Sequence, residues 1–255
     1  MLFTEKLKSN YFGRSFDYFP SIFANRLSIY KSKKITYKVN KIKHKLKDNG
    51  ISYNKRTLFN DVNNEVLFIH IPKAAGMSVV KSLYNQNKSH HASASDYLNE
   101  DADKFQQAFS FAITRNPYTR LYSAYNYLKN GGMNKIDRAW WELYLAKYDS
   151  FESFIIEGGL EYAIEKRAEH FIPQYKFIFD NNEKLQCSFL GKVEAINEAE
   201  EMLSEKLQRR VTFTHLNMMS QSEPVLEDVY SKNMLAIVNL CYKKDLDLLG
   251  YRKIV

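Results

Sequence analysis

The stretch EVLFIHIPKAAGMSVVKSL, residues Glu65 to Leu83, joins an apolar run to a loop of small residues and a helical pattern. Its apolar part, Val66 to Ile71, has the length and composition of a buried strand. Pro72 to Gly76 interrupts this run, and apolar residues then recur at helical spacing. The order predicts a strand, a tight loop and a helix. Such a loop often binds anions, because a helix N-terminus presents unpaired N–H groups and a partial positive charge.

The loop itself, Pro72 to Ser78, lacks the ATP-binding pattern G-x-x-x-x-G-K-[ST], because its lysine precedes its glycine. Residues 74–76 carry almost no side chain, so their backbone N–H groups can approach an anion closely. Lys73 adds a charge that can follow an oxygen during group transfer, and Ser78 adds a hydroxyl donor. The alternative is an ordinary strand–helix turn with a surface lysine.

A second loop, TRNPYTRLYSAY, follows the apolar run Phe109 to Thr114. Arg115 can bind a phosphate through two parallel hydrogen bonds, and Ser123 can donate to the same group. Arg120 and Ser123 share one face of the expected helix. The alternative is an arginine that ties the loop to helix carbonyls. Two such loops at one edge of a parallel sheet predict a ligand with two separated anionic groups.

Strand patterns alternate with helical patterns along the chain. We expect strands at 65–71, 109–114 and 187–194, with helices between and after them, and one long helix from Val229 to Tyr251. The predicted fold class is α/β, a three-layer, P-loop-like parallel sheet flanked by helices.

The basic charge of the chain is concentrated at its start. Residues 1–56 hold 14 Lys and Arg against 3 Asp and Glu, a balance of +11; the whole chain carries +8, so the remainder sums to −3. We predict a basic, aromatic-rich helical extension over residues 1–60 and a main domain over 61–255. The extension is expected to contact a membrane or an anionic polymer, or to present a solvated helical face.

The composition is that of a globular protein, with 45% hydrophobic and 26% charged residues. No apolar run reaches the roughly 18–20 residues that span a bilayer, and we expect no secretory signal. Cys187 and Cys241 lack the spacing of a metal site. They predict neither a disulfide framework nor a zinc site, which fits a reducing compartment.

The two loops carry a family resemblance. PKAAGMS and RNPYTRLYSAY resemble the two phosphate-binding elements of sulfotransferases, and in particular of the carbohydrate branch, sulfotransferase family 2. The segments HFIPQYKFI, GKVEAINE, HLNMMS and YKKDLDLLGY are similar to family segments in family order. The resemblance covers Glu65 to Tyr251 and leaves residues 1–60 outside.

This resemblance implies 3′-phosphoadenosine 5′-phosphosulfate (PAPS) as the sulfuryl donor. The first loop would hold the 5′-phosphosulfate, with Lys73 in a catalytic role, and the second loop would hold the 3′-phosphate. The implied cofactor-binding residues are Pro72, Lys73, Ala74, Ala75, Gly76, Met77, Ser78, Arg115 and Ser123. No metal is expected, because a sulfuryl group carries less charge than a phosphoryl group and can be held by N–H groups and one lysine.

Sulfation of a hydroxyl also needs a base, and the stretch KSHHASASDYL offers two histidines. The resemblance places the base at His91, with His90 as the alternative. The same resemblance implies weaker acceptor contacts for His90, His170 and Gln174. His70 shares a face of its strand with Val66 and Phe68, and we interpret it as structural.

The predicted function is transfer of a sulfuryl group from PAPS to a hydroxyl of a polysaccharide, oligosaccharide or glycolipid. Two alternatives are a nucleotide-dependent kinase on a related scaffold, and a non-enzymatic protein that binds polyanions or membranes. The expected partner is a carbohydrate acceptor, with peripheral contact to a membrane or anionic polymer through residues 1–56 and no specific nucleic acid. The expected location is the cytoplasm, including the membrane periphery.

Overall fold

The structure, a computed structural model, describes residues 57–59, 66–87, 89–213 and 225–255. These residues form two compact units. Ala124–Phe171 belongs to one, and the described parts of Ser52–Ser123 and Ile172–Val255 form the other. The predicted extension, apart from residues 57–59, lies outside the described residues, as does its predicted boundary with the main domain. The HLNMMS segment lies outside them too.

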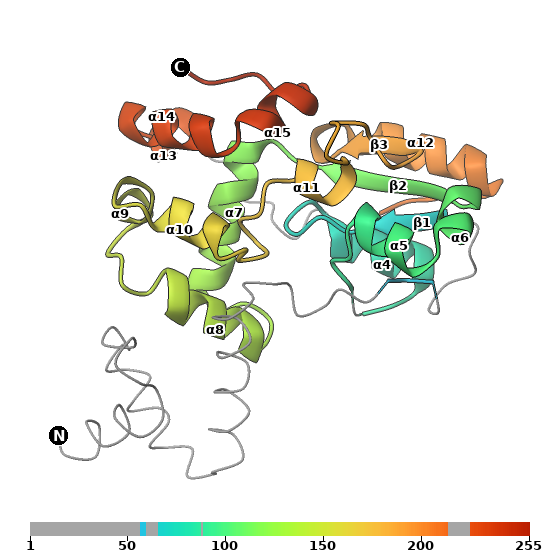
Figure 1. The fold of residues 1–255 in the computed structure, drawn as a ribbon, viewed down its shortest axis with the longest axis horizontal. Helices are drawn as coiled ribbons and strands as arrows, with labels where there is room; N and C mark the ends of the chain where they lie inside the picture. The colour runs from blue at the N-terminus through green and yellow to red at the C-terminus, as the bar shows by residue number, and fades with distance from the viewer. Residues whose placement is uncertain (1–56, 60–65, 88, 214–224) are drawn as a thin grey trace, which may run out of the picture. The chain divides into compact units, whose positions relative to one another are not determined.

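The larger unit is built on a parallel sheet of three strands in the order β1-β2-β3 (Figure 1). These strands are β1 (Val66–Ile69), β2 (Phe109–Thr114) and β3 (Phe189–Lys192). The predicted α/β fold, a P-loop-like parallel sheet flanked by helices, is therefore confirmed. The third strand is shorter than predicted, because a 3-10 turn, η2 (Val193–Ala195), follows it.

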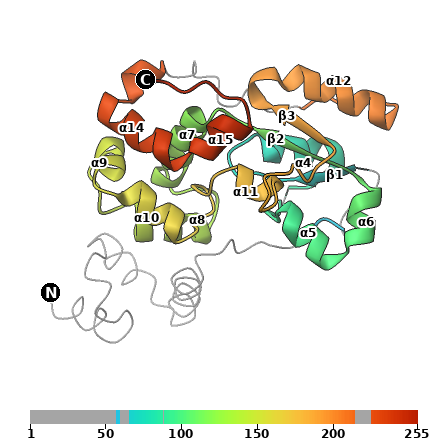
Figure 2. The ribbon, with the colours of Figure 1, turned by 45° about the horizontal axis from the view of Figure 1, so that its top comes forward.

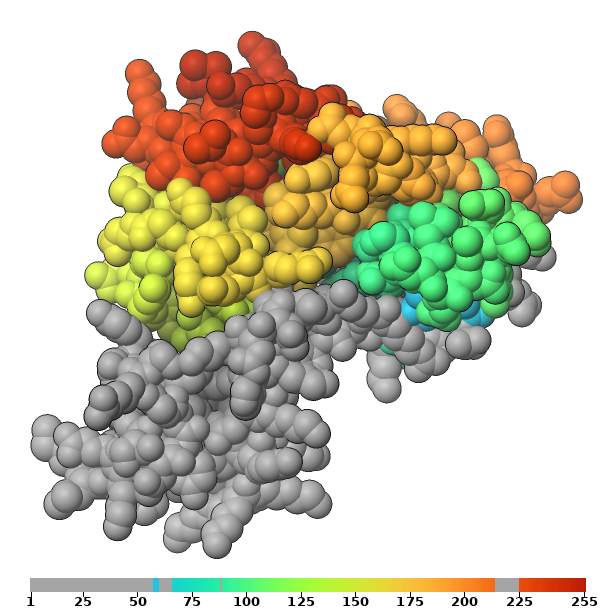
Figure 3. All heavy atoms as spheres, viewed as in Figure 1, coloured from blue at the N-terminus to red at the C-terminus, as the bar shows by residue number. Residues whose placement is uncertain are grey.

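Helices flank this sheet. They are α4 (Gly76–Tyr84), α5 (Ala94–Glu100), α6 (Ala102–Gln107), α11 (Tyr175–Ile178) and α12 (Ile196–Leu207). Helix α12 packs against β3, and α6 packs against β2. Helix α11 packs against α5, and the space-filling view shows the two segments meeting at the surface (Figure 3).

The core lies where the strands meet these helices. Both β1 and β2 are nearly inaccessible along their length, as is usual for strands of a parallel sheet that is covered by helices. Val79 and Val80 of α4 and Leu203 of α12 are fully buried in the same cluster. The core therefore fixes the carboxyl ends of β1 and β2, which lead into the two predicted loops.

A local cap defines the start of helix α7 (Pro117–Lys129). The side chain of Asn116 accepts a hydrogen bond from the Tyr118 N–H, and Pro117 occupies the first helical position. Proline suits that position, because its missing N–H would have no partner in the helix and its φ is already helical. The second loop is therefore only two residues long, Arg115 and Asn116.

The prediction of one long helix from Val229 to Tyr251 is wrong. Helix α13 (Leu226–Val229) ends where this segment begins, and the segment itself contains α14 (Lys232–Cys241) and α15 (Lys243–Leu248). Figure 2 shows α14 and α15 as separate helices. Ser231 caps α14 by accepting from the Met234 N–H. Tyr242, at φ −109° and ψ 22°, leaves helical geometry between α14 and α15.

The smaller unit is helical. It contains the end of α7 together with α8 (Lys135–Tyr144), α9 (Phe151–Ile156) and α10 (Gly159–Glu165). Its interior is aromatic, with the Tyr125 ring 4.9 Å from Phe151 and 5.8 Å from Phe154. In the described part of the chain, every helix is too short or too polar to cross a bilayer.

Two leucines on helices give a matched test of this core. Leu203 is fully buried and Leu240 is 76% exposed. We expect Leu203→Ala to lower the free energy of unfolding by about 2–5 kcal/mol, through lost burial and a residual cavity. Leu240→Ala should stay within about 0.5 kcal/mol of wild type. Urea unfolding measures both, and equal effects would contradict the described core.

Candidate functional site

The first loop presents backbone donors at the start of α4. Lys73 and Ala75 adopt left-handed conformations, with φ of 68° and 60°. This costs roughly 1–2 kcal/mol for each non-glycine residue, and such conformations cluster at functional sites. The N–H groups of Ala75, Gly76 and Met77 donate to no acceptor among the described residues. Three donors at one helix N-terminus are therefore available to an anion.

Gly76 is required by its contact with His70. A Cβ atom at position 76 would lie 1.8 Å from His70 Nε2, so any side chain there would overlap the imidazole. The His70 ring is buried, and its centroid lies 4.5 Å from that of His91 in an edge-on arrangement. His70 Nδ1 also shares a hydrogen bond with Ser89 Oγ. The predicted base therefore lies beside the first loop, with His70 between them.

His90 and His91 are both partly exposed. They precede α5, which Ser93 begins with a capping box to Asp96. This cap fixes the chain two residues after His91. The structure thus places His91 against His70, whose imidazole in turn packs against Gly76 at the first loop. The roles of His90 and His91 stay predictions.

The second loop begins at Arg115, directly after β2. Its Nε donates to Thr119 Oγ1 at 3.1 Å, which bends the side chain over the first turn of α7. Its backbone is held by the Gln174 side chain. Oε1 of Gln174 accepts from the Arg115 N–H at 2.9 Å, and Nε2 donates to the Arg115 carbonyl at 2.7 Å.

Arg120 joins the second loop to the first. It is 1% exposed, and its Nε donates to the Pro72 carbonyl at 2.8 Å. Burial lowers the pKa of Arg120, while Tyr242 and Asp245 act in the opposite direction. A buried hydrogen bond between residues 48 apart in sequence therefore ties the first loop to α7, the helix that begins at the second loop.

Two buried polar atoms of α7 side chains lack hydrogen-bond partners among the described residues. They are Ser123 Oγ and Arg120 Nη2. A buried donor without a partner costs about 1–3 kcal/mol, so such atoms in a native protein need an explanation. A phosphate oxygen can accept a hydrogen bond from a hydroxyl such as that of Ser123 and from a guanidinium N–H such as that of Arg120. This observation fits the predicted placement of an anionic group at Ser123.

Gln174 and Asp245 lie beneath the second loop, and each is 0% exposed. Asp245 accepts from the Gln174 N–H and from the Tyr175 N–H, each at 2.8 Å. Burial raises the pKa of Asp245 to about 6, although these N–H groups and Arg120 favour the ionised form. Both polar atoms of the Gln174 amide contact the Arg115 backbone, and the side chain is fully buried, so its acceptor contact stays a prediction that would require this part of the chain to open.

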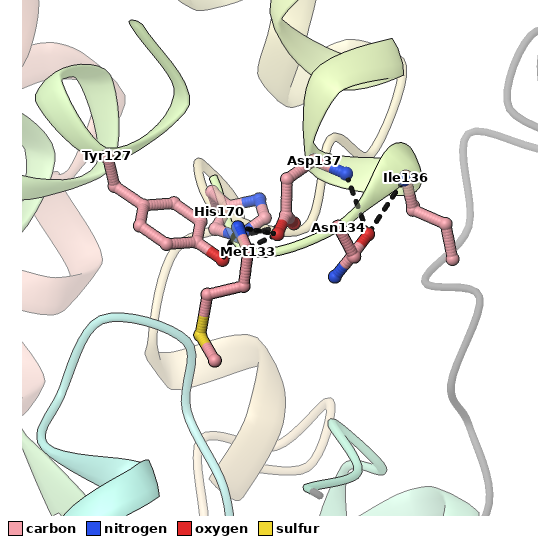
Figure 4. Close-up of polar contacts among 6 residues, drawn as sticks. All are labelled: Tyr127, Met133, Asn134, Ile136, Asp137 and His170. Carbon is pink, nitrogen blue, oxygen red and sulfur yellow. Dashed lines mark hydrogen bonds and ion pairs between the residues drawn. The ribbon is translucent and has the colours of Figure 1, made fainter. Parts of the chain in front are cut away.

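His170 belongs to the smaller unit and lies in a buried polar cluster there (Figure 4). Its Nε2 is 3.7 Å from Asp137 Oδ1, while Asp137 Oδ2 accepts from the Tyr127 hydroxyl at 2.5 Å and the Met133 N–H at 2.9 Å. Burial is the largest cause that raises the pKa of Tyr127, and the hydrogen bond to the Asp137 carboxylate raises it further. Asp137, Glu169 and His170 are close enough to hold a metal ion together. An acceptor contact for His170 stays a prediction.

The larger unit therefore presents three N–H groups without an acceptor among the described residues at the α4 N-terminus, Arg115 and the buried Ser123 hydroxyl at the second loop, and the His91 imidazole beside His70. Sequence reasoning selected these residues, and their roles in binding and catalysis stay predictions. It missed the Arg120–Pro72 bond and the Gln174–Asp245 support. The weak sequence signal for this support was Asp245, which lies in the helical YKKDLDLLGY segment. A carboxylate that is buried there needs hydrogen-bond partners.

A family model described as the sulfotransferase family matches residues 55–252, which include both loops, Gln174 and Asp245. Comparison with curated proteins and with solved structures gave no match.

The buried carboxyl of Asp245 predicts a specific pH dependence of stability. Its pKa is about 6 in the folded protein against an ordinary 3.8, so the folded state keeps a proton that the unfolded chain releases between these values. The free energy of unfolding should therefore fall as pH rises through this window, and the Asp245 contribution should level off above it. The total change is on the order of 3 kcal/mol at most.

Asp245→Asn is the matched variant, because it removes the titration while keeping the shape. Urea unfolding of both proteins between about pH 4 and pH 7 isolates the Asp245 contribution as the difference between the two curves. Curves that stay parallel across this range would contradict the raised pKa.

Proposed function

The chain belongs to the sulfotransferase family, and we propose that it transfers a sulfuryl group from PAPS to a hydroxyl group of a carbohydrate. Sulfuryl transfer follows from the family, whereas the donor and the acceptor class are our proposal. The observation that carries it is the buried junction of the two loops, in which Arg120 Nε donates to the Pro72 carbonyl. That junction would hold the two proposed anion positions at a fixed spacing, which suits a donor with a 5′-phosphosulfate and a 3′-phosphate.

Each end of the donor has suitable partners. The unpaired N–H groups of Ala75, Gly76 and Met77 would hold the 5′-phosphosulfate, with Pro72 to Ala74 and Ser78 shaping the loop. Arg115 and the buried Ser123 hydroxyl would hold the 3′-phosphate. A helix N-terminus and a guanidinium are both common phosphate partners.

The proposed reaction is a direct displacement at sulfur. The acceptor oxygen forms a bond to sulfur, and the bond between sulfur and the bridging phosphate oxygen breaks. Adenosine 3′,5′-bisphosphate then leaves. His91 receives the hydroxyl proton, and Lys73 stabilises the negative charge that develops on the bridging oxygen.

A metal is not required in this proposal. The sulfuryl group carries less charge than a phosphoryl group, so backbone N–H groups and one lysine can stabilise the transfer.

The carbohydrate acceptor rests on the likeness of PKAAGMS and RNPYTRLYSAY to the carbohydrate branch. Polysaccharides, oligosaccharides and glycolipids all offer suitable hydroxyl groups. We further propose that the cations of residues 1–56 bring the enzyme to an anionic polymer or to the cytoplasmic membrane surface, without specific nucleic-acid binding.

The kinase alternative is disfavoured, because the first loop lacks G-K-[ST] and the chain belongs to another family. The same family membership argues against a purely non-enzymatic binding protein.

Ligand binding tests the 3′-phosphate position. Arg115→Ala should weaken binding of adenosine 3′,5′-bisphosphate by about 1.5–3 kcal/mol, because a charged hydrogen bond is lost, and Ser123→Ala should weaken it less. Binding of AMP, which lacks the 3′-phosphate, should barely change. Calorimetry measures both ligands, with Arg210→Ala on the exposed surface as a control. Equal losses for the two ligands would remove these residues from the 3′-phosphate site.

Turnover tests the chemistry. Lys73→Ala should lower kcat by about 10²–10³, because one electrostatic contact to the leaving oxygen is lost. His91→Ala should abolish transfer while the affinity for adenosine 3′,5′-bisphosphate stays unchanged. Transfer of labelled sulfate to a carbohydrate acceptor measures both, with the exposed Lys184→Ala as a control. If His90→Ala abolishes transfer and His91→Ala does not, the base is His90.

A further inference from the structure

We propose that Gln174 is a positioning residue that holds Arg115 in the orientation needed for the 3′-phosphate. This inference rests on the proposed function, and it gives Gln174 a role other than contact with the acceptor. It is carried by three residues of the larger unit, Arg115, Gln174 and Asp245, which come from three distant parts of the chain.

The contact between Gln174 and Arg115 has two points. The amide oxygen accepts from the Arg115 N–H at 2.9 Å, and the amide nitrogen donates to the Arg115 carbonyl at 2.7 Å. A planar amide that binds both groups of one residue fixes its position and its orientation. The ladder between β2 and β3 ends at Thr114, so Gln174 continues the backbone pairing for one further residue.

Gln174 is itself fixed from behind. Asp245, on α15, accepts from the Gln174 N–H with one carboxylate oxygen and from the Tyr175 N–H with the other, each at 2.8 Å. Gln174 and Asp245 are fully buried, so neither amide nor carboxylate can exchange these partners for water. Because unpaired buried polar groups are costly, the whole chain of contacts is held in one arrangement.

This arrangement matters for the ligand. A guanidinium recognises phosphate through a planar fork, so its fit depends on the backbone that carries it. Arg115 follows the last residue of β2 and is only partly buried, so the sheet alone does not hold it. A backbone fixed before binding reduces the ordering that binding must impose.

The same contacts argue against the acceptor role. Both polar atoms of the Gln174 amide are used on the Arg115 backbone, and the residue is 0% exposed. Because the side chain is fully buried, a sugar hydroxyl could reach this amide only if the surrounding chain moved away from it.

The test is a double-mutant cycle with Gln174→Met and Arg115→Ala. Methionine has nearly the shape of glutamine but cannot form the two bonds, and it adds no charge near the phosphate. We expect Gln174→Met to weaken adenosine 3′,5′-bisphosphate about tenfold and AMP less than twofold. In the Arg115→Ala background, Gln174→Met should have no further effect. Gln106→Met, on the exposed face of α6, is the matched control.

The outcomes separate the two proposals. If Arg115→Ala leaves bisphosphate binding unchanged, the proposed 3′-phosphate site fails. If Arg115→Ala weakens binding but Gln174→Met does not, only the positioning role fails. It also fails if Gln174→Met weakens AMP equally, or weakens bisphosphate binding further without Arg115. A higher KM for the carbohydrate with unchanged bisphosphate affinity would make Gln174 an acceptor contact.

A measurement on the wild-type protein covers the case in which Gln174→Met does not fold. The Arg115 amide should exchange its hydrogen at least about 100-fold more slowly than the unpaired Met77 amide, because Gln174 Oε1 accepts from it. Equal exchange at the two amides would overturn the proposal.

Discussion

The hydrogen bond from Arg120 to the Pro72 carbonyl is the constraint on which the site depends. It lies out of contact with water and joins the first residue of one loop to the helix that begins at the other. A buried guanidinium is costly unless its donors are used, so this contact is hard to replace by a solvated alternative. The pairing of β1 with β2 fixes the chain as far as Ile69 and Ala112. Beyond these residues, the Arg120–Pro72 bond restricts how far the two loops can move apart.

The elements that carry the site could be predicted because each follows a local rule. The apolar runs at β1 and β2 and the small residues 74–76 mark their own structures. The break at Tyr242 could not be predicted, because the segment from Val229 to Tyr251 keeps helical periodicity. The separate α15 places Asp245 against the Gln174 and Tyr175 N–H groups, and this tertiary contact is not visible in the sequence.

The site residues divide in the same way. Lys73, Arg115 and Ser123 were predicted as site residues because their charge or hydroxyl group, and their position after a strand, are visible in the sequence. His70 was interpreted as structural, and its imidazole fills the space beside Gly76. Gln174 was predicted to contact the acceptor, because the sequence cannot show that its amide reaches the Arg115 backbone. Residues that act through another residue are read from contacts between distant segments, and those contacts appear only in the fold.

The unpartnered Ser123 hydroxyl and Arg120 Nη2 have a consequence for the stability of the protein. Without ligand, the fold carries the desolvation of both atoms uncompensated, and a bound anion would relieve it. Ligand binding and folding are then thermodynamically linked, since whatever binds only the native state stabilises it by mass action. Binding of the proposed donor should therefore raise the free energy of unfolding of the native enzyme.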